Sequence, residues 1–177
     1  MRFSGPCAAW SPPPTPVVDP HVGVESALTP RGIVFRTPLL ARLNAHAIEL
    51  CLQHRITATR SADTGGRAHL EARRIVTPAV TNEAHYAVTL HEIGHVVSPD
   101  GDSRQYTHVI ADDTMIAVGG ELGAWRWAVD HALAWTQPMQ DRMYGSLLRH
   151  RQRATPAEVG EMVQLLVSAS LRVAPNP

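Results

Sequence analysis

The segment His91-Glu92-Ile93-Gly94-His95 constrains the fold of this 177-residue chain more than any other. On an α-helix, His91 and His95 lie on one face with their Cβ atoms roughly 5–6 Å apart. Two imidazole nitrogens at that separation can bind one zinc ion at about 2.0–2.1 Å each. Glu92 then lies beside the metal without ligating it, where it can polarise a bound water. The segment therefore predicts a helix that carries two metal ligands and a general base.

The residues around this segment predict that the helix is buried. It begins at Thr81 or Asn82, either of which can act as N-cap, and runs to about Val97. Two strips of its surface are apolar or carry the histidines, one with Ala84, Val88, His91 and His95, the other with Leu90, Ile93 and Val97. A helix that is apolar on two sides is buried, so its polar groups need partners. A metal ion supplies such a partner, and the alternative is a pair of ordinary core histidines.

A zinc ion bound by two histidines needs at least one more protein ligand, and Glu121 is the favoured one. It falls within the apolar stripe of a helix predicted over about residues 116–135, next to Val118 and Trp125. A carboxylate at a core-facing position needs an arginine, a hydrogen-bond network or a metal to stay charged. The alternative is a glutamate at the edge of the stripe whose carboxylate reaches water.

Three aspartates are weaker alternatives to Glu121. Asp100 and Asp102 flank Gly101, the position where a longer form of the motif would place a histidine or an aspartate. Both lie in an acidic connection, where solvated side chains are the simpler interpretation. Some zinc peptidases use an aspartate as third ligand, within a characteristic sequence pattern. The segment that begins at Asp141 matches only part of that pattern. A surface position on a helix explains Asp141 better.

The remaining pattern predicts an α+β fold that is mainly helical. Residues 1–36 form a proline-rich arm, and residues 37–177 form a single domain. Helices are predicted over residues 38–54, after an N-cap at Thr37, and from the capping box at Thr155 to about Val173. Residues 56–60 and 69–76 are predicted strands, joined through a turn at residues 61–66 into a small antiparallel hairpin packed on the motif helix.

Charge and cysteine content restrict the classes of binding partner and the cellular compartment that we expect for this chain. Sixteen basic residues, all arginine, balance sixteen acidic ones, so no overall field attracts nucleic acid or anionic lipid. The one basic cluster, residues 149–153, lies between two predicted helices and is more simply a solvated linker. Cys7 and Cys51 form no disulfide framework, which favours a reducing, cytoplasmic location. No segment approaches the roughly 20 apolar residues of a membrane span.

Residues 86–97 and 121–128 resemble the metal-binding helices of the ImmA/IrrE-type metallopeptidases of bacteria and their mobile elements. In the first stretch Tyr-x-x-x-Leu-His-Glu-Ile-Gly-His is similar to that family's active-site helix, and the second is similar to its glutamate-bearing helix. The resemblance implies a zincin-like fold of the gluzincin type, with zinc on His91, His95 and Glu121 and with Glu92 as general base. No helix-turn-helix or sensory module accompanies it, which favours a stand-alone enzyme or a phage-related accessory protein.

The sequence therefore predicts a zinc-dependent metalloendopeptidase that acts on a peptide or protein substrate. Glu92 would activate the zinc-bound water and pass its proton to the leaving amine. The residues considered as donors to the oxyanion are Tyr86, His108, His131 and Tyr144. The alternative is a zinc-containing interaction or accessory protein whose site is structural or vestigial. Nucleic-acid binding is disfavoured by the neutral charge and the few aromatic residues.

Overall fold

The computed structural model describes residues 37–98 and 118–173. Within these ranges the chain forms five α-helices, one short 3-10 helix and a three-stranded sheet. The elements are α2 (Pro38–Gln53), β1 (Thr57–Arg60), β2 (Arg67–His69), β3 (Arg74–Thr77), α3 (Glu83–Val97), α4 (Val118–His131), α5 (Gln137–His150), η3 (Arg151–Arg153) and α6 (Pro156–Ser170). The predicted α+β class with mostly helical content is confirmed. The predictions for the arm at residues 1–36, for Asp100, for Asp102 and for His108 lie outside the described residues.

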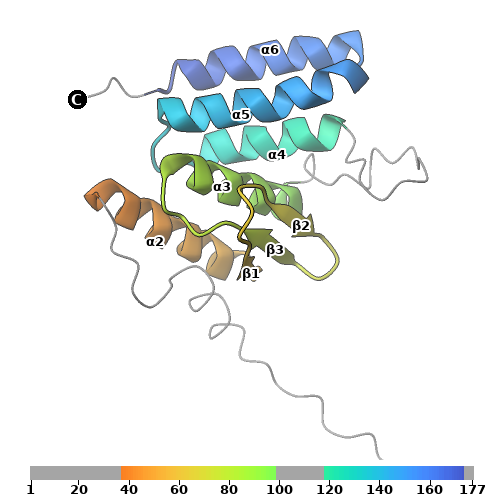
Figure 1. The fold of residues 1–177 in the computed structure, drawn as a ribbon. Helices are drawn as coiled ribbons and strands as arrows, with labels where there is room; N and C mark the ends of the chain where they lie inside the picture. The colour runs from red at the N-terminus through yellow and green to blue at the C-terminus, as the bar shows by residue number, and fades with distance from the viewer. Residues whose placement is uncertain (1–36, 99–117, 174–177) are drawn as a thin grey trace, which may run out of the picture.

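Helix α3 is the centre of the fold. It packs against α2 and the sheet on one side and against α4 and α5 on the other, while α6 covers α4 and α5 (Figure 1). Every residue from 86 to 95 is buried as a result. The prediction that the motif helix is buried on more than one face is confirmed, and its polar side chains lie in the interior.

Three helix starts follow directly from capping side chains. The Thr37 hydroxyl accepts a hydrogen bond from the backbone N–H of Leu40, with Pro38 at the first helical position. Asn82, rather than Thr81, caps α3 by accepting from the N–H of His85. At α6 the predicted capping box of Thr155 and Glu158 is present in full. Local sequence thus fixes where these helices begin.

The predicted antiparallel hairpin is wrong in its pairing. Strand β3 lies between β1 and β2 and pairs with β1 in parallel and with β2 in antiparallel orientation. The hairpin turn lies inside the segment predicted as one continuous strand, where Arg73 adopts a φ of 44° and its N–H donates to the Leu70 carbonyl oxygen. This turn contains neither glycine nor proline, so it carries no common turn signal. The glycines at 65 and 66 serve the connection from β1 to β2 instead.

Helix α4 ends at His131, earlier than the predicted residue 135. Two residues later, the backbone N–H of Leu133 donates to the hydroxyl of Tyr86 at 3.0 Å. The same hydroxyl lies 2.7 Å from Nδ1 of His46. A side chain of α3 therefore takes the backbone donor just past α4, and the chain then turns into α5.

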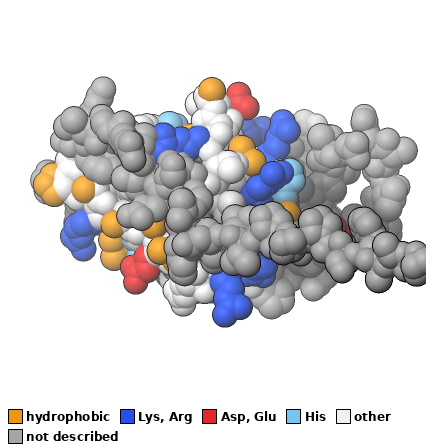
Figure 2. All heavy atoms as spheres, turned by 90° about the horizontal axis from the view of Figure 1, so that it is seen from below, with side chains coloured by type: hydrophobic (Ala, Val, Ile, Leu, Met, Phe, Trp, Pro, Cys, Tyr) orange, Lys and Arg blue, Asp and Glu red, His pale blue; other side chains and the backbone are white. Residues whose placement is uncertain are grey.

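Surface charge on the described residues is dispersed. On the face that carries α2 and the sheet, arginine side chains appear in several separate groups, together with acidic and uncharged side chains (Figure 2). Across the described ranges, no helix has the length and apolar character needed to cross a membrane.

Candidate metal centre

The fold brings His91, His95 and Glu121 together in the interior. Oxygens of the Glu121 carboxylate lie 3.2 Å from Nε2 of His91 and 3.4 Å from Nε2 of His95. The two Nε2 atoms are 3.1 Å apart, and each residue is at most 6% exposed. Three ligand atoms within 4.8 Å of one another form a group that could hold a metal ion. The two histidines come from α3 and the glutamate comes from α4, as the sequence pattern predicts.

The protonation state of this group suits a metal. Burial lowers the pKa of His91 to about 4, because a charged imidazole is poorly solvated there, although Glu121 acts in the opposite direction. Burial alone would raise the pKa of the Glu121 carboxyl, but its contacts with His91 and His95 hold that pKa well below its ordinary value. Neutral imidazole and ionised carboxylate are the forms that ligate metal ions.

Close contact between two helix backbones places Glu121 within reach of the histidines. A Cβ atom on Gly94 would lie 2.6 Å from the carbonyl oxygen of Ala124 and 3.0 Å from its Cα. Real Cβ atoms do not approach backbone this closely, so residue 94 must be glycine for α3 and α4 to cross here. Gly94, between the two histidines of the motif, is therefore needed for the close packing of α3 on α4.

Trp125 fixes the orientation of the first histidine. Its ring stacks on that of His91 with 4.2 Å between centroids and 21° between planes, and Trp125 is almost fully buried. Among the described residues, Nδ1 of His91 has no hydrogen-bond partner. Metal-binding histidines are commonly oriented by a hydrogen bond to their second nitrogen. Here aromatic stacking takes that role.

Glu92 lies next to this group and is also buried, at 5% exposure. Burial raises the pKa of its carboxyl to about 7; His95 and Arg142 lower it, and Glu121 raises it. Gly66 packs directly on the side chain, since a Cβ there would lie 2.5 Å from Cγ of Glu92. A carboxyl group with a pKa near neutrality can accept and release a proton under physiological conditions.

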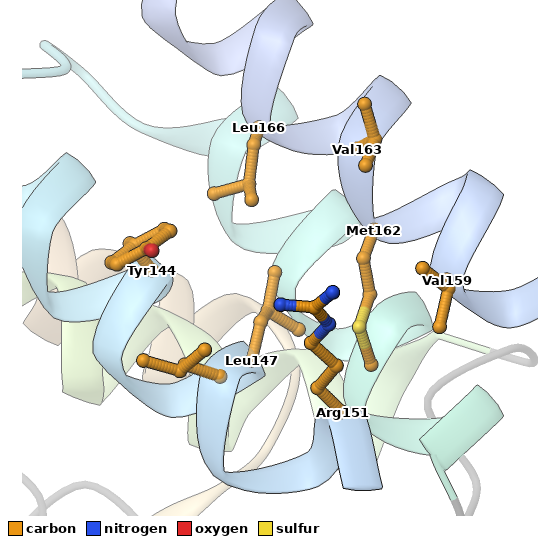
Figure 3. A pocket seen from close by; sticks show the side chains of 8 residues that line it. Tyr144, Leu147, Arg151, Val159, Met162, Val163 and Leu166 are labelled. Carbon is orange, nitrogen blue, oxygen red and sulfur yellow. The ribbon is translucent and has the colours of Figure 1, made fainter.

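The residues considered as oxyanion donors are engaged elsewhere in the fold. The Tyr86 hydroxyl bonds Leu133 and His46. His131 is exposed, and its ring stacks on that of Trp127. Nδ1 of His131 lies 2.8 Å from the backbone carbonyl oxygen of Trp127. Tyr144 lines a cavity of about 210 Å³ between α5 and α6, together with Leu147, Met162 and Leu166 (Figure 3). His108 lies outside the described residues.

Two residues of α5 that the sequence pattern did not indicate lie at the site. Nε2 of His150 is 3.8 Å from Oε2 of Glu121, with the His150 side chain 23% exposed. Arg142 donates from Nη2 to the carbonyl oxygen of Thr64 at 3.1 Å, within the connection that leads to Gly66. Helical periodicity was the available signal, because positions 142, 146 and 150 recur on one face around the buried Ser146. His150 was instead interpreted as part of a basic linker.

No family model, curated protein or solved structure matches this chain. What the arrangement can do is therefore argued from its chemistry. Two imidazoles and a carboxylate converge on one point, and a second buried carboxyl group, that of Glu92, stands beside them. This donor set is suited to a divalent cation such as zinc.

Replacing Glu121 by alanine is expected to abolish stoichiometric zinc binding, because it removes the only charged donor of the three-residue group. Metal content per chain, measured after dialysis against limiting zinc, tests this. Asp141→Ala is the matched control, because Asp141 is exposed and its carboxylate accepts from Gln137 on the same helix. Full zinc occupancy in Glu121→Ala, or its loss in Asp141→Ala, would contradict the assignment.

Proposed function

We propose that this chain is a zinc-dependent metalloendopeptidase with a zincin-like fold of the gluzincin type. His91, His95 and Glu121 would hold the ion, and Glu92 would be the general base. The observation that carries the proposal is the buried Glu92 carboxyl beside three converging, buried metal-ligating side chains. Structural ion-binding groups need no such base, whereas hydrolysis of a peptide bond does.

Glu92 would perform the proton transfers of hydrolysis. A zinc ion at the three side chains would supply a Lewis acid and an acidified water at neutral pH. The Glu92 carboxylate takes a proton as the water oxygen attacks the scissile carbonyl carbon. The protonated Glu92 then gives that proton to the amine nitrogen as the carbon–nitrogen bond breaks. One water is consumed, and Glu92 returns to its ionised form.

The number of preassembled ligands favours a catalytic site over a structural one. Structural zinc sites are closed by four protein ligands, whereas catalytic ones have three and keep a position open for water or substrate. In the parts of the chain that the structure describes, the compact group contains three ligands. His150 approaches Glu121 but does not belong to that group. This supports an enzyme over an interaction protein with a structural or vestigial site.

The position of the sheet supports a peptide as substrate. Strand β2 is an edge strand, because β3 separates it from β1. Gly66 directly precedes β2 and packs on Glu92. An extended peptide that adds to such an edge through backbone hydrogen bonds would pass close to the general base.

The decisive test is the Glu92→Gln variant, assayed with a pool of fluorogenic peptides. We expect zinc content to stay at the wild-type level and kcat to fall by about 10²–10⁴-fold, the usual contribution of a general base. Glu161→Gln is the matched control, because Glu161 is an exposed glutamate of α6 paired with Arg126. Retained activity in Glu92→Gln, or failure of a hydroxamate to inhibit the wild type, would refute the proposal.

A further inference from the structure

Arg142 is a partly buried cation at the edge of the site. Its Nη2 donates to a neutral carbonyl oxygen, that of Thr64, and its buried Nε has no hydrogen-bond partner. No carboxylate of the described residues forms an ion pair with its guanidinium within 4 Å. A partly buried guanidinium in this state is costly, because no carboxylate is in ion-pair contact with it and its Nε–H has no acceptor.

Arg142 faces the catalytic side of the molecule. The connection that it contacts at Thr64 continues to Gly66, which packs on Glu92. Arg142 is also close enough to Glu92 to lower the pKa of that carboxyl, and close enough to Arg149 for the two cations to repel each other. The field beside Glu92 is therefore positive on the α5 side, where an anionic group of a ligand would be stabilised.

We infer that Arg142 binds a carboxylate of the peptide substrate, so that the site prefers peptides with a carboxylate close to the scissile bond. This inference rests on the proposed peptidase function. Guanidinium recognises carboxylates through paired N–H donors. Among the described residues only Nη2 of Arg142 has an acceptor, the Thr64 carbonyl oxygen, so the donors of Nη1 are available to a ligand. The carboxylate belongs to the free C-terminus of the peptide or to an acidic side chain.

The spacing along α5 sets where this carboxylate lies. His150 stands beside Glu121 at the metal group, and Arg142 precedes it by two turns of the same helix. Eight residues of α-helix span about 12 Å. An extended peptide covers that distance in roughly three to four residues. The recognised carboxylate is therefore within a few residues of the bond that is cut.

A purely structural role for Arg142 makes a different prediction. If Arg142 only held the connection at Thr64 against Glu92, its loss would weaken every ligand equally. If it binds a carboxylate, its loss would remove the advantage of acidic ligands and leave neutral ones unchanged. The ratio between the affinities for acidic and for neutral ligands therefore distinguishes carboxylate binding from a structural role, whereas one affinity alone does not.

The test is calorimetric binding to the zinc-loaded full chain carrying Glu92→Gln, which keeps the ligands in place without cleavage. Four pools of random hexapeptides serve as probes. The first pair of pools contains no acidic residues, and one pool ends in a free carboxylate while the other ends in an amide. In the second pair all peptides end in an amide, and one pool carries a single Glu at a varied position while the other carries a single Gln. We expect a free-acid or Glu-containing pool to bind about 10- to 100-fold more tightly than its neutral counterpart. Arg142→Gln should abolish that ratio, and Arg142→Lys should restore part of it.

The outcomes identify the source of the carboxylate and separate this inference from the proposed function. An advantage of acid over amide assigns the C-terminus, and an advantage of Glu over Gln assigns a side chain. Equal affinities within both pairs, or a ratio that persists in Arg142→Gln, overturn the inference. Arg153→Gln, in the exposed η3 turn, is the control arginine and should leave the ratio unchanged. If the ratio behaves as expected but the wild type cleaves no pool, the proposed peptidase activity fails while the carboxylate site stands.

Discussion

Replacing Gly94 by alanine is expected to destabilise the fold and to abolish zinc binding in the same variant. The added methyl would lie 2.6 Å from a backbone oxygen of Ala124, and backbone cannot rotate away as a flexible side chain would. Helix α4 must therefore shift from α3, which withdraws Glu121 from His91 and His95. We expect a loss of about 2–3 kcal/mol in the free energy of unfolding, measured by urea denaturation, together with loss of bound zinc.

Gly160→Ala is the matched control for this variant. Gly160 lies inside α6, and nothing stands within 4 Å of the position that its Cβ would occupy. There the same substitution should stabilise the protein by about 0.5–1 kcal/mol through helix propensity and leave zinc content unchanged. Equal effects at the two positions would show that the contact with Ala124 does not restrict residue 94.

Helices were predictable from the sequence where their signals are local. Thr37 with Pro38, Asn82, and Thr155 with Glu158 each place a capping group next to the helix that they start. The end of α4 was not predictable in this way. Its position reflects the hydroxyl of Tyr86, which is 47 residues away in sequence from its partner Leu133.

The sheet shows the same division between local and distant causes. Two strand segments were predicted from the sequence, but pairing order depends on contacts made after the chain has folded back. The glycines at 65 and 66 were interpreted as a hairpin turn. In the structure Gly66 leaves space for the Glu92 side chain, whose Cγ would lie 2.5 Å from a Cβ at position 66. A turn signal and a packing requirement look identical in a sequence.

The site was predictable as far as residue chemistry and helical period extend. His91, His95 and Glu121 were found because their side chains are unusual on buried helix faces. Arg142 and His150 escaped notice because arginine and histidine on a helix are ordinary, and only the packing of α5 against α3 makes them neighbours of the site. A sequence pattern identifies the ligands more readily than the surroundings that tune them.

Glu92→Gln is expected to make the metal-free protein more stable at alkaline pH, because the native carboxylate is held where it is poorly solvated. Burial raises the pKa of Glu92 to about 7 in the folded state, against about 4.3 in an unfolded chain. Between these pH values the folded protein binds a proton that the unfolded chain releases. The free energy of unfolding therefore falls as pH rises through this window, by about 4 kcal/mol in total, and stays lowered above it. Glutamine is neutral at every pH and avoids this loss.

Urea unfolding with a chelator present, at pH 5 and at pH 8, measures the effect as a difference between the variant and the wild type. Subtraction removes the groups that both proteins share, including His91, whose lowered pKa acts in the opposite direction by reducing stability as pH falls. The advantage of Glu92→Gln should grow by roughly 2.5 kcal/mol between the two pH values. For the exposed Glu161→Gln the same difference should change by less than about 0.5 kcal/mol. An advantage that is equal at both pH values would mean that Glu92 is ionised throughout this range and that burial does not raise its pKa.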